Sequence, residues 1–402
     1  MMKAVIVGGG VAGPAAALAL HHVGLETVVL ERRSDPNPTE GSYFTVAPNG
    51  LDALDLLGVL DLAREVGFPT RTNAMYGATG RPLGELSLGV PLADGTVALT
   101  AKRSLLAARL LDEAERRGVD VRRGAEVADV SSDATGAVVT LADGERLTAD
   151  LVIGADGVRS RVRQVIDPTA PAGRYVGLTN FGGITRGTAL AESLRPEAWH
   201  FVFGAQAFFG AHPTPDGDVV WFVNVPEPEI SRERRAATTD AEWQRRLVEL
   251  LTGDAGPAAE LVATGVLELA GDNTYDLPHV PRWTRDRLVL VGDAAHAPSP
   301  SSGQGASMAL EDAVVLATSI RDHATTPADL PAALRAYEQA RRARVERIVK
   351  AGARSSSSKI PGPVGRRFQE AAMRLVFRYL VTDRSTAWLT GSRLSWDGVK
   401  AA

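Results

Sequence analysis

The sequence contains no cysteine among its 402 residues. This absence excludes disulfide bonds, thiolate nucleophiles and zinc or iron–sulfur sites with cysteine ligands. Any redox chemistry in this chain must therefore come from a bound cofactor.

Lysine, aromatic residues and net charge are also scarce. Five of the 44 basic residues are Lys, aromatics make up 5% of the chain, and the formal net charge is −4. Nucleic-acid binders normally carry a basic excess, and platforms that stack single strands need aromatic rings. The seven histidines show no metal-ligand spacing. We expect no nucleic-acid partner and no metal site.

A long, uninterrupted apolar segment is missing as well. Residues 4–25 carry no charged side chain, but several glycines and Pro14 interrupt them. A buried strand, a glycine turn and a buried helix explain this segment better than a signal peptide or a membrane span. We therefore expect a cytoplasmic protein without a membrane span.

Apolar runs and helical periodicity alternate along the chain, which is typical of an α/β protein. Residues 3–7, a helix ending near His22 and residues 26–30 form a predicted βαβ unit with parallel strands. Further strands are predicted at 119–122, 127–131, 138–141, 151–153, 199–203, 207–212, 219–225 and 287–291, with a hairpin turn at Asp143-Gly144. Further helices are predicted at 46–66, 104–118, 239–251, 307–321, 332–349 and 366–380, the last after a Ser-rich break at 355–365.

The first glycine motif spans Gly8–Gly13 and follows the first strand. Gly8 permits the tight turn, Gly10 lets a pyrophosphate approach the backbone, and Gly13 allows close helix–strand packing. Glu31 ends the second strand, where an acid can bond ribose hydroxyls. The motif predicts dinucleotide binding. The alternative is a tight turn that binds nothing.

Two more motifs follow apolar strands. The second runs from Gly154 to Arg163 and contains Asp156, and the third runs from Gly292 to Ser307 and contains Asp293. The run from Gly303 opens a helix, whose N–H groups can hold an electron-rich group such as a flavin edge.

These three motifs resemble those of the FAD-dependent aromatic hydroxylases, the single-component class A flavoprotein monooxygenases of the para-hydroxybenzoate hydroxylase type. The resemblance covers about residues 3–345. It implies an α/β fold with a Rossmann-like FAD-binding domain of the glutathione-reductase type, an inserted β-sheet substrate domain and a C-terminal helix. The implied boundaries are 1–70, 101–175 and 281–350 for the FAD domain, 71–100 and 176–280 for the substrate domain, and 351–402 for the C-terminal segment.

The resemblance also implies which residues contact the cofactor. Ser307 stands where many members have Asn, and its hydroxyl can still donate a hydrogen bond. The residues expected to bind FAD are Gly8, Gly10, Ala12, Gly13, Glu31, Arg32, Arg103, Val127, Asp156, Asp293, Pro300, Gly303, Gly305, Ala306 and Ser307.

By the same resemblance, NADPH or NADH binds transiently and reduces the flavin, and O2 then gives a C4a-hydroperoxide that hydroxylates an aromatic or polyketide-like substrate. The cofactor carries this reaction, so the protein must orient the substrate and exclude water. Pro300 is expected beside the reacting flavin. We expect a small-molecule partner and a monomer or homodimer.

The strand-rich region 175–280 is the expected substrate lid. Phe201, Phe209 and Trp221 are candidate substrate contacts, although alternate residues of a sheet must also pack its core. His212, before Pro213, is a candidate general base for a phenol, and the alternative is a solvent-facing loop residue.

Two rival functions use the same nucleotide fold. A flavin halogenase, or another flavin oxidoreductase acting on a secondary metabolite, is the first. Halogenases need a catalytic Lys and a W-x-W-x-I-P stretch, which the sequence does not contain. A flavoprotein without catalytic activity is the second, and only turnover measurements distinguish it.

Overall fold

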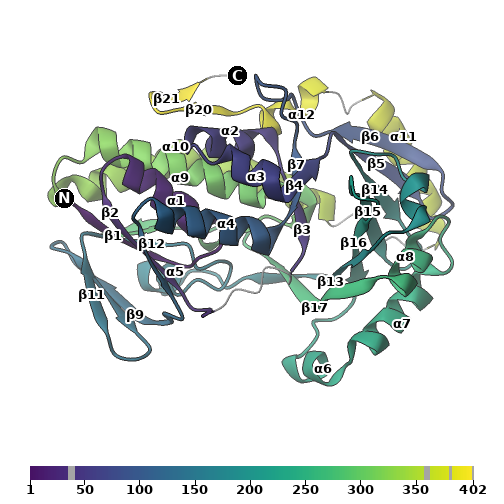
Figure 1. The fold of residues 1–402 in the computed structure, drawn as a ribbon, viewed down its shortest axis with the longest axis horizontal. Coiled ribbons are helices and arrows are strands. Elements are labelled where there is room, and N and C mark those ends of the chain that lie inside the picture. The colour runs from purple at the N-terminus through teal and green to yellow at the C-terminus, as the bar shows by residue number, and fades with distance from the viewer. Residues whose placement is uncertain (35–40, 357–362, 380–382, 401–402) are drawn as a thin grey trace.

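The computed structural model describes residues 1–34, 41–356, 363–379 and 383–400 (Figure 1). Two large sheets organise this part of the chain. A six-stranded sheet with the N-terminal βαβ unit lies at one end, and a seven-stranded sheet lies at the other.

The six-stranded sheet has the strand order β18-β19-β12-β1-β2-β8, and all of its pairs are parallel except the edge pair β18–β19. Helices cover its faces, so its central strands are apolar runs rather than alternating ones. The predicted Rossmann-like arrangement is confirmed. The strands are β1 (Lys3–Val7), β2 (Glu26–Glu31), β8 (Asp120–Arg123), β12 (Leu151–Gly154), β18 (Thr284–Arg285) and β19 (Leu288–Leu290).

Long helices pack on this sheet and on one another. Helix α1 lies against α9, and α9 lies against α10. Seven of the 11 residues of helix α1 are Ala or Leu, and the helix is buried from Gly13 to Leu20. The helices of this part are α1 (Ala12–His22), α4 (Arg103–Arg116), α5 (Arg161–Ile166), α9 (Gly305–His323) and α10 (Leu330–Ser356), with short 3₁₀ turns η2 (Gly292–Ala294), η3 (Pro300–Ser302) and η4 (Pro327–Asp329).

The single helix predicted over 46–66 is wrong in one respect, since it is two helices, α2 (Pro48–Leu56) and α3 (Leu60–Val66). Gly58 adopts a φ of 66° between them, a left-handed conformation that ends a helix. The predicted hairpin at Asp143-Gly144 is confirmed. It joins β10 (Ala137–Leu141) to β11 (Arg146–Ala149), beside β9 (Val127–Ser132).

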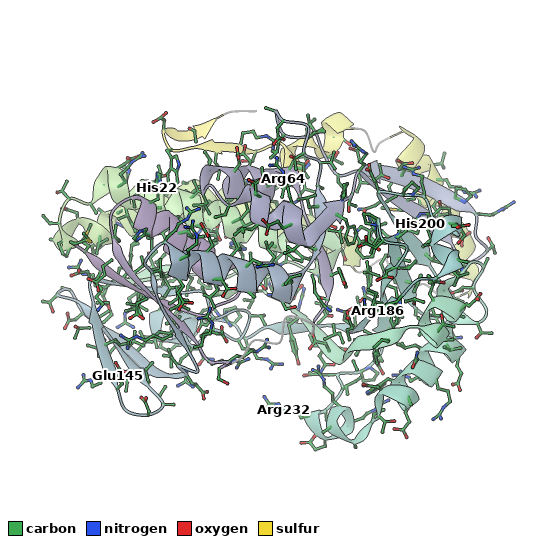
Figure 2. All side chains as sticks on the ribbon, viewed as in Figure 1. His22, Arg64, Glu145, Arg186, His200 and Arg232 are labelled. Atoms are coloured by element: carbon green, nitrogen blue, oxygen red, sulfur yellow. The ribbon has the colours of Figure 1, made fainter. Side chains whose placement is uncertain are left out.

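The seven-stranded sheet has the order β17-β13-β16-β15-β14-β5-β6. One face is covered by α7 (Asp240–Leu251) and α8 (Ala258–Thr264), which enclose a second apolar core. Arg186 and His200, labelled in Figure 2, lie in this part of the molecule. Its strands are β5 (Thr72–Gly77), β6 (Pro82–Ser87), β13 (Arg174–Thr185), β14 (Ala198–Phe203), β15 (Phe208–Pro213), β16 (Val219–Pro226) and β17 (Val266–Asp276), with η1 (Ala189–Ser193) and α6 (Arg232–Ala237) between them.

The strand predictions omit β17 and give no bounds for β13, which pair with each other along their length. The glycines of β13 weaken its strand pattern in the sequence, because glycine lowers strand propensity. Gly183 is required there, since a Cβ would stand 2.3 Å from the carbonyl oxygen of Val266 and 2.4 Å from the Trp221 ring.

A small third sheet lies against the free face of the seven-stranded sheet. It has the order β3-β7-β4, with β3 (Tyr43–Val46), β4 (Gly67–Pro69) and β7 (Leu99–Lys102). The Trp199 indole donates from β14 to the hydroxyls of Thr45 and Thr100, at 3.0 and 3.1 Å. Helix α4 begins directly after β7, so this sheet connects the two large ones.

The C-terminal segment contains more than the single helix predicted at 366–380. Helix α11 (Pro363–Tyr379) packs on β6, and α12 (Asp383–Thr390) leads to the hairpin of β20 (Arg393–Ser395) and β21 (Gly398–Lys400). This hairpin lies beside α2 (Figure 1), where the Leu394 N–H donates to Asp52. Most of the predicted break at 355–365, and Leu380, lie outside the described residues.

Within the described ranges, no helix is long and apolar enough to cross a membrane.

Trp221 anchors the core beneath α7 and α8. Its side chain is 2% exposed, and its indole donates to Thr185 at 3.1 Å. We expect Trp221→Ala to lower the free energy of unfolding by about 3–5 kcal/mol, because it leaves a large cavity. Urea unfolding of the flavin-bound protein measures the change. Val266→Ala, at a side chain that is 58% exposed, is the control and should change it by less than about 0.5 kcal/mol.

Candidate cofactor and active site

The first glycine motif is pressed against the second. Gly8 has a φ of 113°, and a Cβ on it would stand 2.5 Å from the carbonyl oxygen of Ala155. A Cβ on Gly13 would stand 1.8 Å from the carbonyl oxygen of Gly8. Both positions therefore require glycine, as the sequence pattern predicts.

The third motif meets the other two at the same end of the sheet. A Cβ on Gly292 would stand 3.0 Å from the Cβ of Ala12, and the guanidinium of Arg163 donates to the Ala294 carbonyl at 3.0 Å. The three motifs follow β1, β12 and β19, whose carboxyl ends lie side by side because the strands are parallel. Ligands of open α/β sheets bind at this edge.

Two helices begin at this edge without a cap. Neither α1 nor α9 has a side chain bonded to its first N–H groups, and neither has an acid in its first turn. A Cβ on Gly10 would meet nothing within 4 Å, so the loop surface is open there. Free N–H groups at an open helix N-terminus suit the pyrophosphate of a dinucleotide. The chain's residues therefore fit FAD.

Glu31 closes over the first motif. Its carboxylate accepts the Gly9 N–H at 2.7 Å and the Arg33 N–H at 2.9 Å. Each oxygen keeps a further acceptor position, which leaves the carboxylate able to bond a hydroxyl. This is the place at the end of the second strand that the sequence predicts.

Arg103 and Asp293 come together although 190 positions separate them in the sequence. The Arg103 guanidinium lies 3.6 Å from the Asp293 carboxylate, and their side chains are 61% and 33% exposed. The pair is therefore accessible at the rim of the site, with polar atoms that a phosphate or a ribityl chain can reach.

Asp156 has a structural contact in the second motif. Its carboxylate accepts the N–H groups of Arg161 and Val162, which caps α5, and burial raises its pKa. Val127 lies in β9, Pro300 in η3, and Gly303 adopts a φ of 60° before α9. Direct FAD contacts of these residues, and of Arg32, Gly305 and Ala306, stay predictions.

Ser307 is placed differently from the expectation. It is fully buried, and its hydroxyl accepts the Ala47 N–H at 3.1 Å at the start of α2. A Cβ on Gly50 would stand 2.7 Å from the same hydroxyl. The side chain therefore joins α2 to α9, and a direct flavin contact of Ser307 stays a prediction.

A buried charge cluster behind the third motif was missed by the sequence analysis. Asp312 accepts the Gly292 N–H at 2.9 Å, and lies 2.5 Å from His296 Nε2 and 2.7 Å from Arg341 Nε. Burial alone would raise the pKa of Asp312, but the charges of His296 and Arg341 hold it below its ordinary value. The signal in the sequence was the pair of acids Glu311 and Asp312 within the predicted helix 307–321. Asp and Glu are rarely fully buried unless they are paired.

Aromatic side chains gather between the seven-stranded sheet and the small sheet of β3, β4 and β7. We call them the aromatic face. They include adjacent rings such as Trp199 and Phe222, whose centroids lie 5.5 Å apart. The members are Tyr43, Phe68, Trp199, Phe201 and Phe222.

The three predicted substrate contacts are not brought together. Phe201 belongs to the aromatic face, whereas Phe209 and Trp221 belong to the core beneath α7 and α8. Successive residues of a strand point to opposite faces, so membership in a strand does not place a side chain in the site. The prediction that Phe209 and Trp221 contact the substrate is therefore corrected, because both side chains lie in this core.

His212 is neither a solvent-facing residue nor an available base. It lies in β15 and is 1% exposed. Its Nδ1 donates to the Pro213 carbonyl at 2.8 Å, so Nε2 of the neutral ring accepts from the Thr70 hydroxyl at 3.0 Å. Burial lowers its pKa to about 4. Since both nitrogens are engaged, the geometry does not support His212 as the general base.

The fold and the site together define a dinucleotide-binding flavoprotein with an attached aromatic sheet. The family model described as "FAD binding domain" matches residues 1–352, and the chain belongs to this family.

Named relatives point the same way. The chain is 31% identical over 361 residues to the FAD-dependent urate hydroxylase of Mycolicibacterium vanbaalenii, which covers 87% of this chain and 86% of the relative. It is 29% identical to the aurachin C monooxygenase/isomerase of Stigmatella aurantiaca, with 85% of each covered. The crystal structure of Klebsiella pneumoniae HpxO with FAD and uric acid superposes with a TM-score of 0.81 at 27% identity, covering 96% of each chain.

The protein is thus an FAD-dependent monooxygenase of the class A flavoprotein family, and FAD is its cofactor. The predicted resemblance and the predicted cofactor are confirmed. None of the named relatives is a halogenase, and that alternative is not supported.

Substitutions at Gly10 and Gly13 are expected to distinguish FAD binding from folding. We expect Gly10→Ala to leave the fold intact but to reduce FAD affinity by about tenfold or more, because a methyl group enters the phosphate-facing surface of the loop. Gly13→Ala should lose both FAD and thermal stability, because the turn itself must open. Flavin absorbance of the purified protein and unfolding of its apo form measure the two effects. Equal FAD affinity in Gly10→Ala and the parent would contradict the assignment.

The depressed pKa of His212 predicts a pH-dependent stability. Between pH 4 and the ordinary histidine pKa of 6.5, the unfolded chain binds a proton that the folded chain does not. Stability should therefore fall as the pH is lowered, by about 2 kcal/mol at pH 5 relative to pH 7.5. Urea unfolding at both pH values measures this drop. In His212→Asn, which keeps a donor for the Pro213 carbonyl, the drop should be about 2 kcal/mol smaller.

Proposed function

We propose that the protein uses NADPH or NADH and O2 to hydroxylate an aromatic or polyketide-like small molecule. The observation that carries this proposal is the aromatic face, which stands beside the strand leading to Arg103. Planar rings bind between aromatic side chains by stacking and by edge-to-face contact. The relatives' action on urate, and the FAD and uric acid bound by the structural neighbour, support a planar substrate here.

Bound FAD would supply the redox chemistry, taking electrons from the nicotinamide and activating O2. The chain's own residues would bind and orient. The open N-termini of α1 and α9 would hold electron-rich groups, and Glu31 would bond a ribose hydroxyl. Arg103, near Asp293, would place a positive charge beside the phosphates.

The aromatic face would orient the substrate and exclude water. Its rings lie on two sheets that meet through the Trp199 indole, so a ligand bound against them would be shielded from water by both sheets. Exclusion of water matters in this class of reaction, because the activated oxygen is otherwise lost as hydrogen peroxide.

Incubation with NADPH or NADH, isotopically labelled O2 and a panel of phenols, heteroaromatics and polyketides tests the proposal. We expect one labelled oxygen atom in a product, with nicotinamide oxidation stimulated by that substrate. Phe201→Ala should lower kcat/KM by about tenfold or more, because it removes a stacking surface. Nicotinamide oxidation that yields hydrogen peroxide alone, with every compound of the panel, would count against a hydroxylase.

A further inference from the structure

A buried ion pair joins the small sheet to the seven-stranded sheet. Lys102 Nζ at the end of β7 lies 2.8 Å from Glu268 Oε1 in β17, and the two side chains are 9% and 11% exposed. Two charges that are buried away from water carry a desolvation penalty. Their attraction offsets this penalty only when their remaining polar atoms also have hydrogen-bond partners.

Glu268 does not meet that condition. Its second oxygen, Oε2, is buried and has no hydrogen-bond partner among the residues that the structure describes. Buried carboxylate oxygens in folded proteins are almost always bonded to a donor. The ion pair therefore leaves one buried acceptor on Glu268 that a donor of a ligand can satisfy.

The pair stands within the proposed substrate site. Lys102 Nζ lies 5.5 Å from the centre of the Tyr43 ring, and the Tyr43 and Phe68 centroids are 6.4 Å apart. Lys102 immediately precedes Arg103 of the cofactor site. Thr100, two positions earlier on the same face of β7, bonds the Trp199 indole. The pair therefore adjoins both the aromatic face and the cofactor residues.

The charge of Glu268 also affects the pKa of the neighbouring Tyr43 phenol. Burial, with the negative charge of Glu268 as the next cause, raises the pKa of Tyr43 to about 12. The phenol stays protonated at neutral pH. The wall beside Glu268 is therefore a neutral ring over which the Lys102 ammonium lies, a favourable cation–π arrangement.

We propose that Lys102 and Glu268 are the specificity-determining polar anchor of the substrate site. Glu268 Oε2 accepts an N–H or O–H of the substrate, and the Lys102 ammonium donates to an adjacent substrate oxygen. The substrate class is a neutral, planar ring with a hydrogen-bond donor next to an oxygen acceptor, as in a cyclic lactam. This inference rests on the proposed function for the location of the substrate.

The geometry of the pair explains this class. An ammonium has three protons and gives one to Glu268, so it can give another to the ligand. The two charges cancel, which favours a neutral ligand over an anion or a cation. A site that bonds a substrate N–H strongly rejects an analogue that lacks it, because the carboxylate oxygen is then buried without a partner.

Binding to the oxidised, FAD-loaded protein tests the anchor without turnover. The probes are 2-pyridone, 2-quinolone and uracil, which are neutral at pH 7, each beside its N-methylated counterpart, titrated while the visible flavin spectrum is followed. In the parent protein at least one lactam should bind about ten- to a hundredfold more tightly than its methylated form. In Glu268→Gln the amide oxygen accepts from the Lys102 ammonium, so the NH2 group takes the place of Oε2 and a donor replaces the acceptor. This variant should lose the preference because its binding of the lactam alone is weakened.

Two further variants test whether a loss of the lactam preference is caused by misfolding. Lys102→Met combined with Glu268→Met removes both charges together, so no lone charge is buried, and it should also lose the preference. Glu85→Gln, in a half-exposed pair with Arg195, is the matched control and should keep it. FAD content and thermal unfolding of every variant report the fold.

The inference is overturned if the parent binds none of the three lactams, or if Glu268→Gln keeps the preference for lactam over methylated lactam. Its failure is distinct from that of the proposed function. Hydroxylation of other aromatic compounds with no lactam preference would retain the function and remove the anchor. Lactam preference without oxygen insertion would do the reverse.

Discussion

The cluster around Asp312 holds the cofactor site together. This one carboxylate bonds the backbone of Gly292 in the third motif, the ring of His296 and the guanidinium of Arg341 in α10. All three side chains are buried. Removal of one partner would leave the others charged in an apolar core, which costs several kcal/mol, so the position of the third motif depends on the whole cluster.

Glu311, the neighbour of Asp312, extends this dependence to α2 and to the C-terminal segment. It accepts from Asn49 at 2.8 Å and from Arg341 and Arg344. Arg344 in turn donates to the carbonyl of Trp388 in α12. The segment after residue 383 is therefore bonded, through two side chains, to the helix that begins at the cofactor loop.

The hydrogen bonds between the seven-stranded sheet and the small sheet of β3, β4 and β7 also have a fixed order of donors and acceptors. The Pro213 carbonyl can only accept, so His212 donates from Nδ1 and accepts at Nε2 from Thr70. Thr70 must then accept from Thr100, at 2.7 Å, and Thr100 from Thr45, at 2.9 Å. A neutral, buried histidine thus orients three hydroxyls, which explains its burial without a catalytic role.

The sequence alone determined the class of fold, the FAD cofactor and the glycine motifs, because the tight turn, the open helix N-terminus and the short apolar strand are local requirements. Gly8, Gly13 and Glu31 stand where that local logic places them. The tertiary structure decided which side chains gather on the aromatic face and which lie in the core beneath α7 and α8. Phe201 and Phe209 lie in paired strands, yet they point to opposite faces, and Lys102 meets Glu268 across 166 positions of sequence. Such contacts depend on strand register and sheet packing, which no local pattern encodes.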